Sequence, residues 1–398
     1  MQIPDLADYM RSGTLQFASL PPLSLYVHLP WCIQKCPYCD FNSHEIKVSE
    51  MPGEMYISAL MADLEVALPL VWGRVIHSVF IGGGTPSLFD PEAIDKILSG
   101  VRSRLNLLPN CEVTLEANPG TFEKDRFRGF RSAGVNRLSV GVQSFDDRFL
   151  KTLGRVHDSS QAFAAVEEVA QAFDTFNLDI MYALPGQSVN DLVHDVEKAL
   201  SVSPSHISIY QLTLEPNTFF SKFPPILPEL DVAYDMLDVI NDMTEQAGLN
   251  RYEVSAYSLN GHRCAHNLNY WQFGDYLGIG AGAHSKLSFP HRIVRQVRYR
   301  EPRMYMKKAL AGESLAIEED VNRIDLPFEF MLNALRLKDG VSLEKFTERT
   351  GLAVTAIEAA LIEAEQQGLL DRDINYIKPS VKGYDFLNNL QALFLPKN

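Results

Sequence analysis

Short apolar runs alternate with longer stretches of helical periodicity over the first half of the chain. Six runs are rich in Val, Ile, Leu, Phe and Tyr and end in Gly, Pro, Asn or Gln, which is typical of buried strands. They cover residues 24–30, 75–84, 112–118, 137–143, 175–185 and 206–216. Apolar residues recur at helical spacing between them, for example in 91–105, 160–173 and 189–201. Alternating strands and helices predict a parallel sheet with right-handed crossovers.

Six units are too few for a complete eight-fold barrel, and a doubly wound open sheet would give the same pattern. The unusual residues distinguish the two. Cysteines follow the first run, a Gly-Gly-Gly-Thr-Pro sequence ends the second, and the next three runs carry Glu116, Gln143 and Asp179. Polar groups at successive strand ends converge if the sheet curves into a barrel, whereas an open sheet gathers ligands at one switch point. We therefore expect an α/β fold with a partial (β/α)6 barrel of the TIM type.

The pattern changes after about residue 225. A helix is predicted over 230–248 and a strand over 251–259, followed by a Gly- and aromatic-rich segment at 266–285. Three helices (328–337, 342–351 and 354–370), a short hairpin (374–380) and a last helix (383–394) then suggest a winged-helix-like module. The predicted domains are an N-terminal extension (1–22), the barrel (23–225), an accessory α+β segment (226–325) and the C-terminal module (326–398).

Charge and composition exclude several classes of protein. The chain has 398 residues and a formal net charge of −14, which argues against a phosphate-binding surface along its length. The C-terminal module has eight Lys or Arg against ten Asp or Glu, so DNA binding is not expected there either. No apolar run approaches the roughly 20 residues of a membrane span, and the N-terminus lacks the features of a secretory signal. Five cysteines, three of them clustered, indicate a reducing cytoplasm rather than a disulfide framework.

Cys32, Cys36 and Cys39 follow the first predicted strand with C-x3-C-x2-C spacing. A structural zinc site would need a fourth ligand, for which His44 and Asp40 are the nearest candidates. A redox pair made of the last two cysteines would leave Cys32 without a role. A [4Fe–4S] cluster normally takes four thiolates, so three leave one iron open to an exogenous ligand. The spacing and the missing fourth ligand favour the cluster, with zinc and chance as the alternatives.

Together with Tyr38 before the last cysteine, this motif resembles the signature of radical S-adenosylmethionine (SAM) proteins. The sequences YVHLPWC, GGGTPS, EANPG, GVQSF followed by LGR, and LDIMYALPGQ resemble the HemN/HemW family in order and spacing, from Leu23 to the C-terminus. The coproporphyrinogen oxidase branch of that family carries a further cysteine where this chain has Phe41. The heme-chaperone branch, HemW, lacks that cysteine and carries H-N-x-x-Y-W, which here is residues 266–271.

The resemblance implies a heme chaperone with a [4Fe–4S] cluster and SAM, which binds heme and passes it to an acceptor protein in the cytoplasm. A weak association with a membrane-bound acceptor is part of this expectation, and nucleic acid is not an expected partner. The alternative is an enzyme, an oxygen-independent coproporphyrinogen III oxidase. A zinc-stabilised binding module is a third interpretation, which the polar residues at successive strand ends disfavour.

The resemblance also assigns residues to the SAM site. They are Tyr26, Gly83, Gly84, Thr85, Glu116, Gln143, Arg155 and Asp179. The glycines would let a ligand approach the backbone, or simply form a tight turn. Glu116 could bind a ribose hydroxyl or an ammonium group, or cap the next helix. Arg155 could hold a carboxylate through two hydrogen bonds, or be a surface cation. Asp179 lies in an apolar strand and requires a polar partner, while Tyr26 could serve only in strand packing.

His266 is the candidate heme ligand. Neutral imidazole is a common axial ligand of heme iron, and Tyr270 and Trp271 offer flat surfaces for a porphyrin. The same residues could equally pack a core. Cys264 is a second possible iron ligand, and the absence of C-x-x-C-H argues against c-type attachment of heme.

Overall fold

The structure is a computed structural model that describes residues 15–121 and 126–396. Residues 1–14, most of the predicted N-terminal extension, lie outside this range. Within the described parts of the chain, no helix is both long enough and apolar enough to cross a membrane. The domain boundaries given above stay a prediction.

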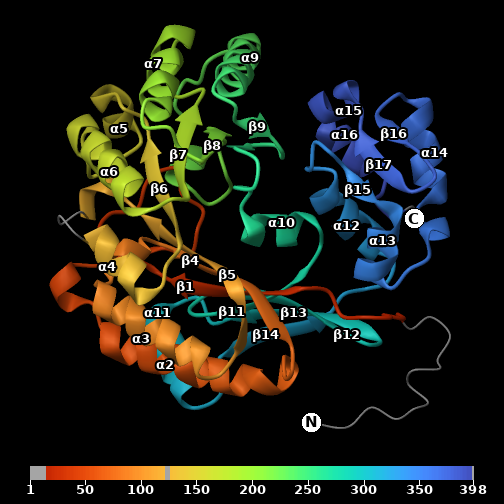
Figure 1. Cartoon of the computed structure of the whole chain (residues 1–398), viewed down its shortest axis with the longest axis horizontal. Helices are drawn as coiled ribbons and strands as arrows, with labels where there is room; N and C mark the ends of the chain where they lie inside the picture. Colours follow the sequence, from red (N-terminus) through yellow and green to blue (C-terminus); the bar gives the residue numbers. More distant parts are fainter. Residues whose placement is uncertain (1–14, 122–125, 397–398) are drawn as a thin grey trace.

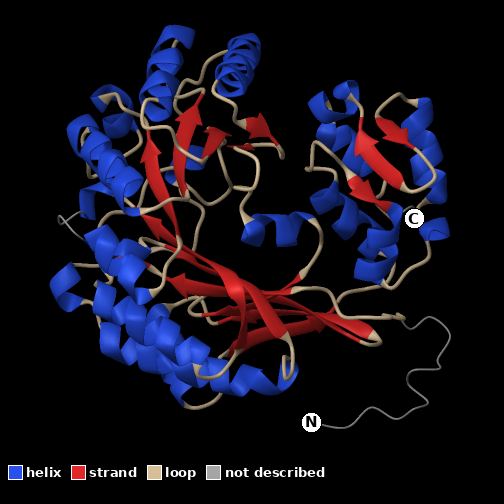
Figure 2. Cartoon of the chain, viewed as in Figure 1, coloured by secondary structure: helices blue, strands red, loops and turns tan. Residues whose placement is uncertain are grey.

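The six apolar runs form the six parallel strands that their pattern predicts. Each pairs in parallel with the next strand along the chain. Their bounds are β1 (Leu23–Leu29), β4 (Val75–Gly83), β5 (Asn106–Ala117), β6 (Arg137–Gln143), β7 (Phe176–Tyr182) and β8 (His206–Gln211). Spatial order equals chain order, and the sheet curves around a concave side (Figures 1 and 2). The partial barrel is confirmed, and the doubly wound alternative is wrong.

Helices cover the convex face of this sheet (Figure 2). The longer ones are α2 (Gly53–Ala67), α3 (Pro91–Arg102), α4 (Arg126–Ala133), α6 (Ser159–Ala172), α7 (Val189–Leu200) and α9 (Leu230–Gln246). Two of them begin with reciprocal capping boxes, at Asp158 and at Ser188, which satisfy otherwise unpaired backbone N–H groups. Alternate strand residues such as Leu25 and Val27 are fully buried beneath the helices.

Six further strands extend the same sheet to twelve. The spatial order is β14-β13-β12-β11-β1-β4-β5-β6-β7-β8-β10-β9. The added strands are β9 (Asn250–Arg251), β10 (Ala256–Ser258), β11 (Asp275–Ile279), β12 (His284–Phe289), β13 (Arg292–Arg298) and β14 (Leu315–Asp320). The single strand predicted over 251–259 is therefore two short ones. In the Gly-rich segment, the backbone of His284 comes so close to Gly278 that a Cβ there would lie 2.0 Å from the His284 carbonyl oxygen. Glycine is therefore required at this position.

A buried carboxylate fastens these added strands to the barrel. Asp63 on α2 is fully enclosed and accepts hydrogen bonds from the backbone N–H of Gly280 (3.2 Å), the Tyr305 hydroxyl (2.9 Å) and the Ser314 hydroxyl (2.6 Å). It also pairs with the buried guanidinium of Arg298 at 3.3 Å. Tyr305 belongs to α11 (Pro302–Leu310) and Arg298 to β13, while Gly280 follows β11 and Ser314 precedes β14. One side chain thus joins α2 to α11, to β13 and to the residues next to two further strands.

A short helix, α10 (Ala265–Trp271), lies in the concavity of the sheet (Figure 1). Glu112 on β5 accepts hydrogen bonds from the backbone N–H groups of Ala265 (3.2 Å) and His266 (3.1 Å). Asn269 donates to the Ser24 hydroxyl near the start of β1 (3.0 Å). Ser24 and Glu112 both pair with Ser78, and Ser24 is the second residue of β1, so α10 lies at the amino-terminal side of the barrel interior.

The C-terminal module is helical, with a small sheet. Its helices are α12 (Leu326–Ala334), α13 (Leu343–Thr350), α14 (Glu358–Gln366), α15 (Val381–Asp385) and α16 (Leu387–Ala392). The strands β15 (Val341–Ser342), β17 (Tyr376–Pro379) and β16 (Leu370–Arg372) pair in that order. The helix predicted over 354–370 ends at Gln366 because Gly368 turns the chain with φ +68°, and the hairpin starts earlier than expected.

Replacing Asp63 by Asn should lower the free energy of unfolding by about 3 kcal/mol, because the buried Arg298 guanidinium loses its counter-charge. Urea unfolding curves measure the loss. The matched control is Glu65→Gln on the same helix, whose ion pair with Arg104 is exposed and should contribute less than about 1 kcal/mol. An Asp63→Asn variant as stable as the control would show that the carboxylate does not fasten the added strands.

Candidate functional site

The cysteine loop follows β1 at the carboxyl end of the barrel. Its two ends are held together where β2 (Trp31–Cys32) pairs in parallel with β3 (His44–Glu45). The N–H of Ile46 donates to the Cys32 carbonyl at 3.0 Å, and the Pro37 carbonyl accepts from Phe220 in α8 (Phe219–Lys222) at 3.0 Å. The loop is thus fixed at its base and at its tip, with all three cysteines half-buried.

Each of the three thiols has its own polar neighbour. The Thr85 hydroxyl lies 3.4 Å from the sulfur of Cys32, and a guanidinium N–H of Arg155 donates to the sulfur of Cys36 at 3.5 Å. The sulfur of Cys39 is 3.7 Å from the Ser43 hydroxyl. Hydrogen bonds to cluster sulfurs are one of the means by which proteins tune iron–sulfur centres.

The donor set fits a four-iron cluster. Among the described residues no three His, Cys, Asp or Glu side chains converge closely enough to hold one metal ion. A [4Fe–4S] cluster does not require such convergence, because each thiolate binds a different iron. Burial raises the pKa of the Cys32 and Cys39 thiols, and a bound metal reverses this by stabilising the thiolates.

Glycines bring the end of β4 against the cysteine loop. A Cβ on Gly84 would lie 2.5 Å from the Trp31 carbonyl oxygen, and one on Gly83, where φ is +117°, would lie 2.6 Å from the His28 ring. Side chains are excluded at both positions by contacts within the protein. The approach lets Thr85 N–H donate to the Trp31 carbonyl (2.8 Å) and places the Thr85 hydroxyl beside Cys32.

Asn118, just after β5, links two of the cysteines through hydrogen bonds. Its side-chain amide donates to the Thr85 hydroxyl (2.9 Å), and its carbonyl oxygen accepts from Arg155. Arg155 also donates to the Gly141 carbonyl at 2.8 Å, and its buried Nε has no partner among the residues that the structure describes. Asn118 was not predicted, although its position beside Glu116 at a strand end was a usable signal.

Two carboxyl groups face the barrel interior below this bridge. Glu116 accepts from the backbone N–H of Gly83 at 3.1 Å, and burial followed by repulsion from Asp179 raises its pKa to about 7. Asp179 accepts from the Asn177 amide (2.8 Å) and the Ser139 hydroxyl (3.1 Å), so the expectation of polar partners is confirmed. Burial also raises the pKa of Asp179.

Tyr26 lies deeper in the interior. Its hydroxyl donates to Nδ1 of His28 (3.0 Å), because Nε2 of His28 donates to the Asn42 carbonyl (2.9 Å). Burial lowers the pKa of His28 to about 4, so the imidazole is neutral. Tyr26 therefore orients a histidine that supports the cysteine loop through Asn42.

Gln143 has a left-handed backbone conformation (φ 73°) at a break in register between β6 and β7. A non-glycine residue in this region is uncommon and often lies at a functional site. With it, the carboxyl end of the barrel gathers Cys32, Cys36, Cys39, Gly83, Gly84, Thr85, Glu116, Gln143, Arg155 and Asp179.

His266 lies on α10, at the amino-terminal side of the barrel interior, where its ring is 6.4 Å from that of Tyr26. Its Nδ1 is 3.0 Å from the Ser78 hydroxyl, and its side chain is only 2% exposed. Burial lowers the pKa of His266 to about 3, and its Nε2 has no partner in the described parts of the chain. Tyr270 packs edge-on against its ring at 5.1 Å. Cys264 is buried beside Glu112.

Comparison with known proteins gives two family matches. Residues 26–199 match the radical SAM superfamily, and residues 321–386 match the HemN C-terminal domain. Both the barrel and the C-terminal module therefore have recognised counterparts.

Curated relatives match nearly the whole chain. The protein named heme chaperone HemW from Escherichia coli (strain K12) is 46% identical over 378 residues, which cover 94% of this chain and 99% of the relative. A protein of the same name from Haemophilus influenzae is 45% identical over 94% of this chain and 98% of its own length. Among solved structures, coproporphyrinogen III oxidase (HemN) from Escherichia coli has a TM-score of 0.80 at 22% identity, covering 98% of this chain and 92% of that one. This last similarity concerns the fold alone.

The raised pKa of Glu116 predicts a pH-dependent difference between the wild type and Glu116→Gln. Folding raises the pKa from its ordinary 4.5 to about 7, so the folded state holds the proton more tightly. The stability that this carboxyl contributes is complete below pH 4.5 and is lost as the pH rises to about 7. Glutamine stays neutral, so the variant should gain about 3 kcal/mol relative to the wild type across this interval. Urea unfolding at several pH values tests this, and parallel pH profiles for the two proteins would contradict it.

Proposed function

The chain belongs to the HemW family of the radical SAM superfamily, and on this basis we propose that it is a heme chaperone, which binds heme and transfers it to an acceptor protein. The observation that carries the proposal is the 46% identity to a protein named heme chaperone HemW, over 94% of this chain. Phe41 supports the chaperone. By the resemblance of motifs described above, the coproporphyrinogen oxidase branch carries a further cysteine at this position.

We propose that Cys32, Cys36 and Cys39 hold a [4Fe–4S] cluster. The three half-buried thiols on one anchored loop, each with a separate polar neighbour, support this assignment. Such a cluster supplies an iron with an open position for the amino and carboxylate groups of SAM.

The SAM site is proposed to lie beside the cysteine loop. The buried Nε–H of Arg155 has no partner in the described parts of the chain, which suits a carboxylate. Glu116 could accept a hydrogen bond from an ammonium or hydroxyl group. The remaining residues of the proposed site are Tyr26, Gly83, Gly84, Thr85, Gln143 and Asp179. Because Gly83 and Gly84 are already required by contacts with His28 and Trp31, their role toward SAM is to leave the backbone accessible.

The assignment of His266 as a heme ligand stays a prediction. Because the His266 side chain is only 2% exposed, it can reach heme only if α10 moves away from the barrel interior. The five free cysteines are compatible with a reducing cytoplasm as the place of action. Association with a membrane-bound acceptor has no support in the structure or in the relatives, and the acceptor is proposed only as a protein.

Anaerobic reconstitution should yield about four irons and four sulfides per chain, because three thiolates and one open iron match this cluster. Cys32→Ser, Cys36→Ser and Cys39→Ser should each lose most of the iron and sulfide. Cys111→Ser is the matched control, since Cys111 is buried on β5 outside the loop and should not affect loading. Stoichiometric zinc without sulfide in protein purified under anaerobic conditions would contradict the cluster.

The function itself is tested by two assays on the same reconstituted protein. Titration with heme should show a saturable site by absorbance, and incubation with coproporphyrinogen III, SAM and a reductant should give no decarboxylated product. The reason is that a phenyl ring at position 41 cannot take the acid–base or ligand role of a thiol. Repeated turnover to protoporphyrinogen without saturable heme binding would replace the chaperone by the oxidase.

A further inference from the structure

Three side chains from different parts of the barrel form a hydrogen-bonded bridge between two of the cysteine sulfurs. The bridge starts at the sulfur of Cys32, which is 3.4 Å from the Thr85 hydroxyl. That hydroxyl is 2.9 Å from the amide nitrogen of Asn118, whose carbonyl oxygen contacts Arg155. At the far end, Arg155 donates to the sulfur of Cys36 at 3.5 Å. The cysteine loop contributes only the two sulfurs, so the barrel itself determines the bridge.

The members of the bridge come from three consecutive strand–helix units. Thr85 follows β4, Asn118 follows β5, and Arg155 follows the short helix α5 (Asp147–Thr152) after β6. Asn118 is the central member, because it is the one that contacts both of the others. A change at this position therefore acts on both sulfurs through other residues.

The chemistry of Arg155 fixes the direction of each hydrogen bond in the bridge. A guanidinium group has only donors, so the carbonyl oxygen of Asn118 must face Arg155 and its NH₂ group must face Thr85. The Thr85 oxygen accepts from this NH₂ group, which leaves the single hydroxyl proton to point at the sulfur of Cys32. Asparagine provides this polarity because one planar group carries a donor and an acceptor. Aspartate has only acceptors and would take the Thr85 proton for itself.

The surroundings of Asn118 hold its side chain in this position. The backbone N–H of Asn118 donates to the Ser87 hydroxyl at 3.2 Å. On β6, a Cβ at Gly141 would lie 2.7 Å from the Asn118 carbonyl oxygen, so a glycine is required there to make room for the amide. The Gly141 carbonyl also accepts from Arg155 at 2.8 Å. The bridge is thus built into the backbone of two neighbouring strands.

We propose that Asn118 is a positioning residue that raises the reduction potential of the cluster by directing two hydrogen-bond donors at its sulfurs. The donors are the Thr85 hydroxyl at Cys32 and the Arg155 guanidinium at Cys36. Reduction adds a negative charge to the cluster, and donors to its sulfurs stabilise that charge. The inference rests on the proposed cluster and concerns how the barrel adjusts it.

The experiment measures the reduction potential of the reconstituted full-length protein without SAM. Dithionite and redox dyes set the potential, and the EPR signal reports the reduced cluster. Asn118→Asp keeps an acceptor for Arg155 but draws the Thr85 proton away from Cys32, so the potential should be lower than in the wild type. Thr85→Val removes the same donor directly and should also lower it. Equal iron and sulfide contents ensure that the same cluster is compared.

Double variants separate the lost hydrogen bond from the added charge. When Thr85→Val has already removed the donor, a further Asn118→Asp change should lower the potential by less than it does in the wild type. Asn118→Ala adds no charge and frees the Thr85 hydroxyl to turn, so it should lower the potential too, again by less in the Thr85→Val background. Thr85→Ser keeps the hydroxyl and should retain the wild-type potential.

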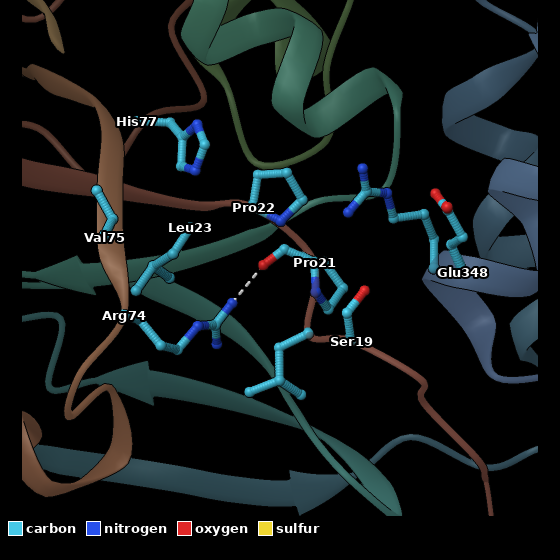
Figure 3. Close-up of a pocket in the computed structure, with 10 residues that line it drawn as sticks. Ser19, Pro21, Pro22, Leu23, Arg74, Val75, His77 and Glu348 are labelled. Atoms are coloured by element: carbon cyan, nitrogen blue, oxygen red, sulfur yellow. Dashed lines mark hydrogen bonds between the residues drawn. The ribbon is translucent and has the colours of Figure 1, made fainter. Parts of the chain in front are cut away.

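Asn106→Asp is the matched control for charge. Asn106 is the exposed first residue of β5, at the end of the strand opposite Asn118. It pairs with Val75, which lines a shallow pocket at the start of β4 (Figure 3). The variant adds the same negative charge to the same strand but far from the cysteine loop. Its reduction potential should equal that of the wild type.

The possible results distinguish the role of Asn118 from the cluster on which it rests. Shifts of equal size for the Asn118 variants in the presence and in the absence of the Thr85 hydroxyl would overturn the positioning role. An unchanged potential in Asn118→Ala and Thr85→Val would overturn it as well, while the cluster assignment stands. A wild type that assembles no iron–sulfur cluster would overturn both proposals.

Discussion

The concave face of a curved sheet must be filled and its polar groups must be paired, and the rest of this protein depends on how that is done. The interior side chains of the parallel strands are largely polar. At the amino-terminal end of the barrel, Glu112 on β5 accepts hydrogen bonds from two backbone N–H groups of α10. With α10 fixed in this position, the amino-terminal end of the barrel interior is closed. The carboxyl end of the barrel stays available for the cysteine loop and the groups around it, as is usual for barrels of this type.

Different contacts hold the two ends of the barrel. At the carboxyl end, Thr85, Asn118 and Arg155 connect separate strands to two sulfurs of the loop. The amino-terminal end is held by hydrogen bonds between α10 and the strands, and Arg336 of the C-terminal module stacks over the Trp271 ring at 4.2 Å. The two ends of the barrel are thus held by separate sets of contacts.

Local patterns in the sequence were sufficient to predict the parallel strands and the position of the three cysteines on a loop after β1, because apolar runs and residue spacing are local properties. The cost of burying a charge was enough to predict that Asp179 has polar partners, but not which residues they are. Strands β11 to β14 could not be predicted, since β11 is placed by pairing with β1, far away in sequence. Asn118 was missed because its role depends on Thr85 and Arg155 meeting in space.

The position of β1 has a consequence for biosynthesis. This strand lies between β4 and β11, and the loop that follows it is tied to the distant part of the chain through Asn42, whose amide donates to the Ala281 and Arg300 carbonyls at 2.9 Å each. A ribosome releases the amino-terminal part first, so β1 and its cysteines wait for one neighbour until most of the chain has been translated. During that interval the loop lacks the two hydrogen bonds that the Asn42 amide donates in the finished fold. The loop that carries the cysteines therefore gains its final support only after Ala281 and Arg300 have been synthesised.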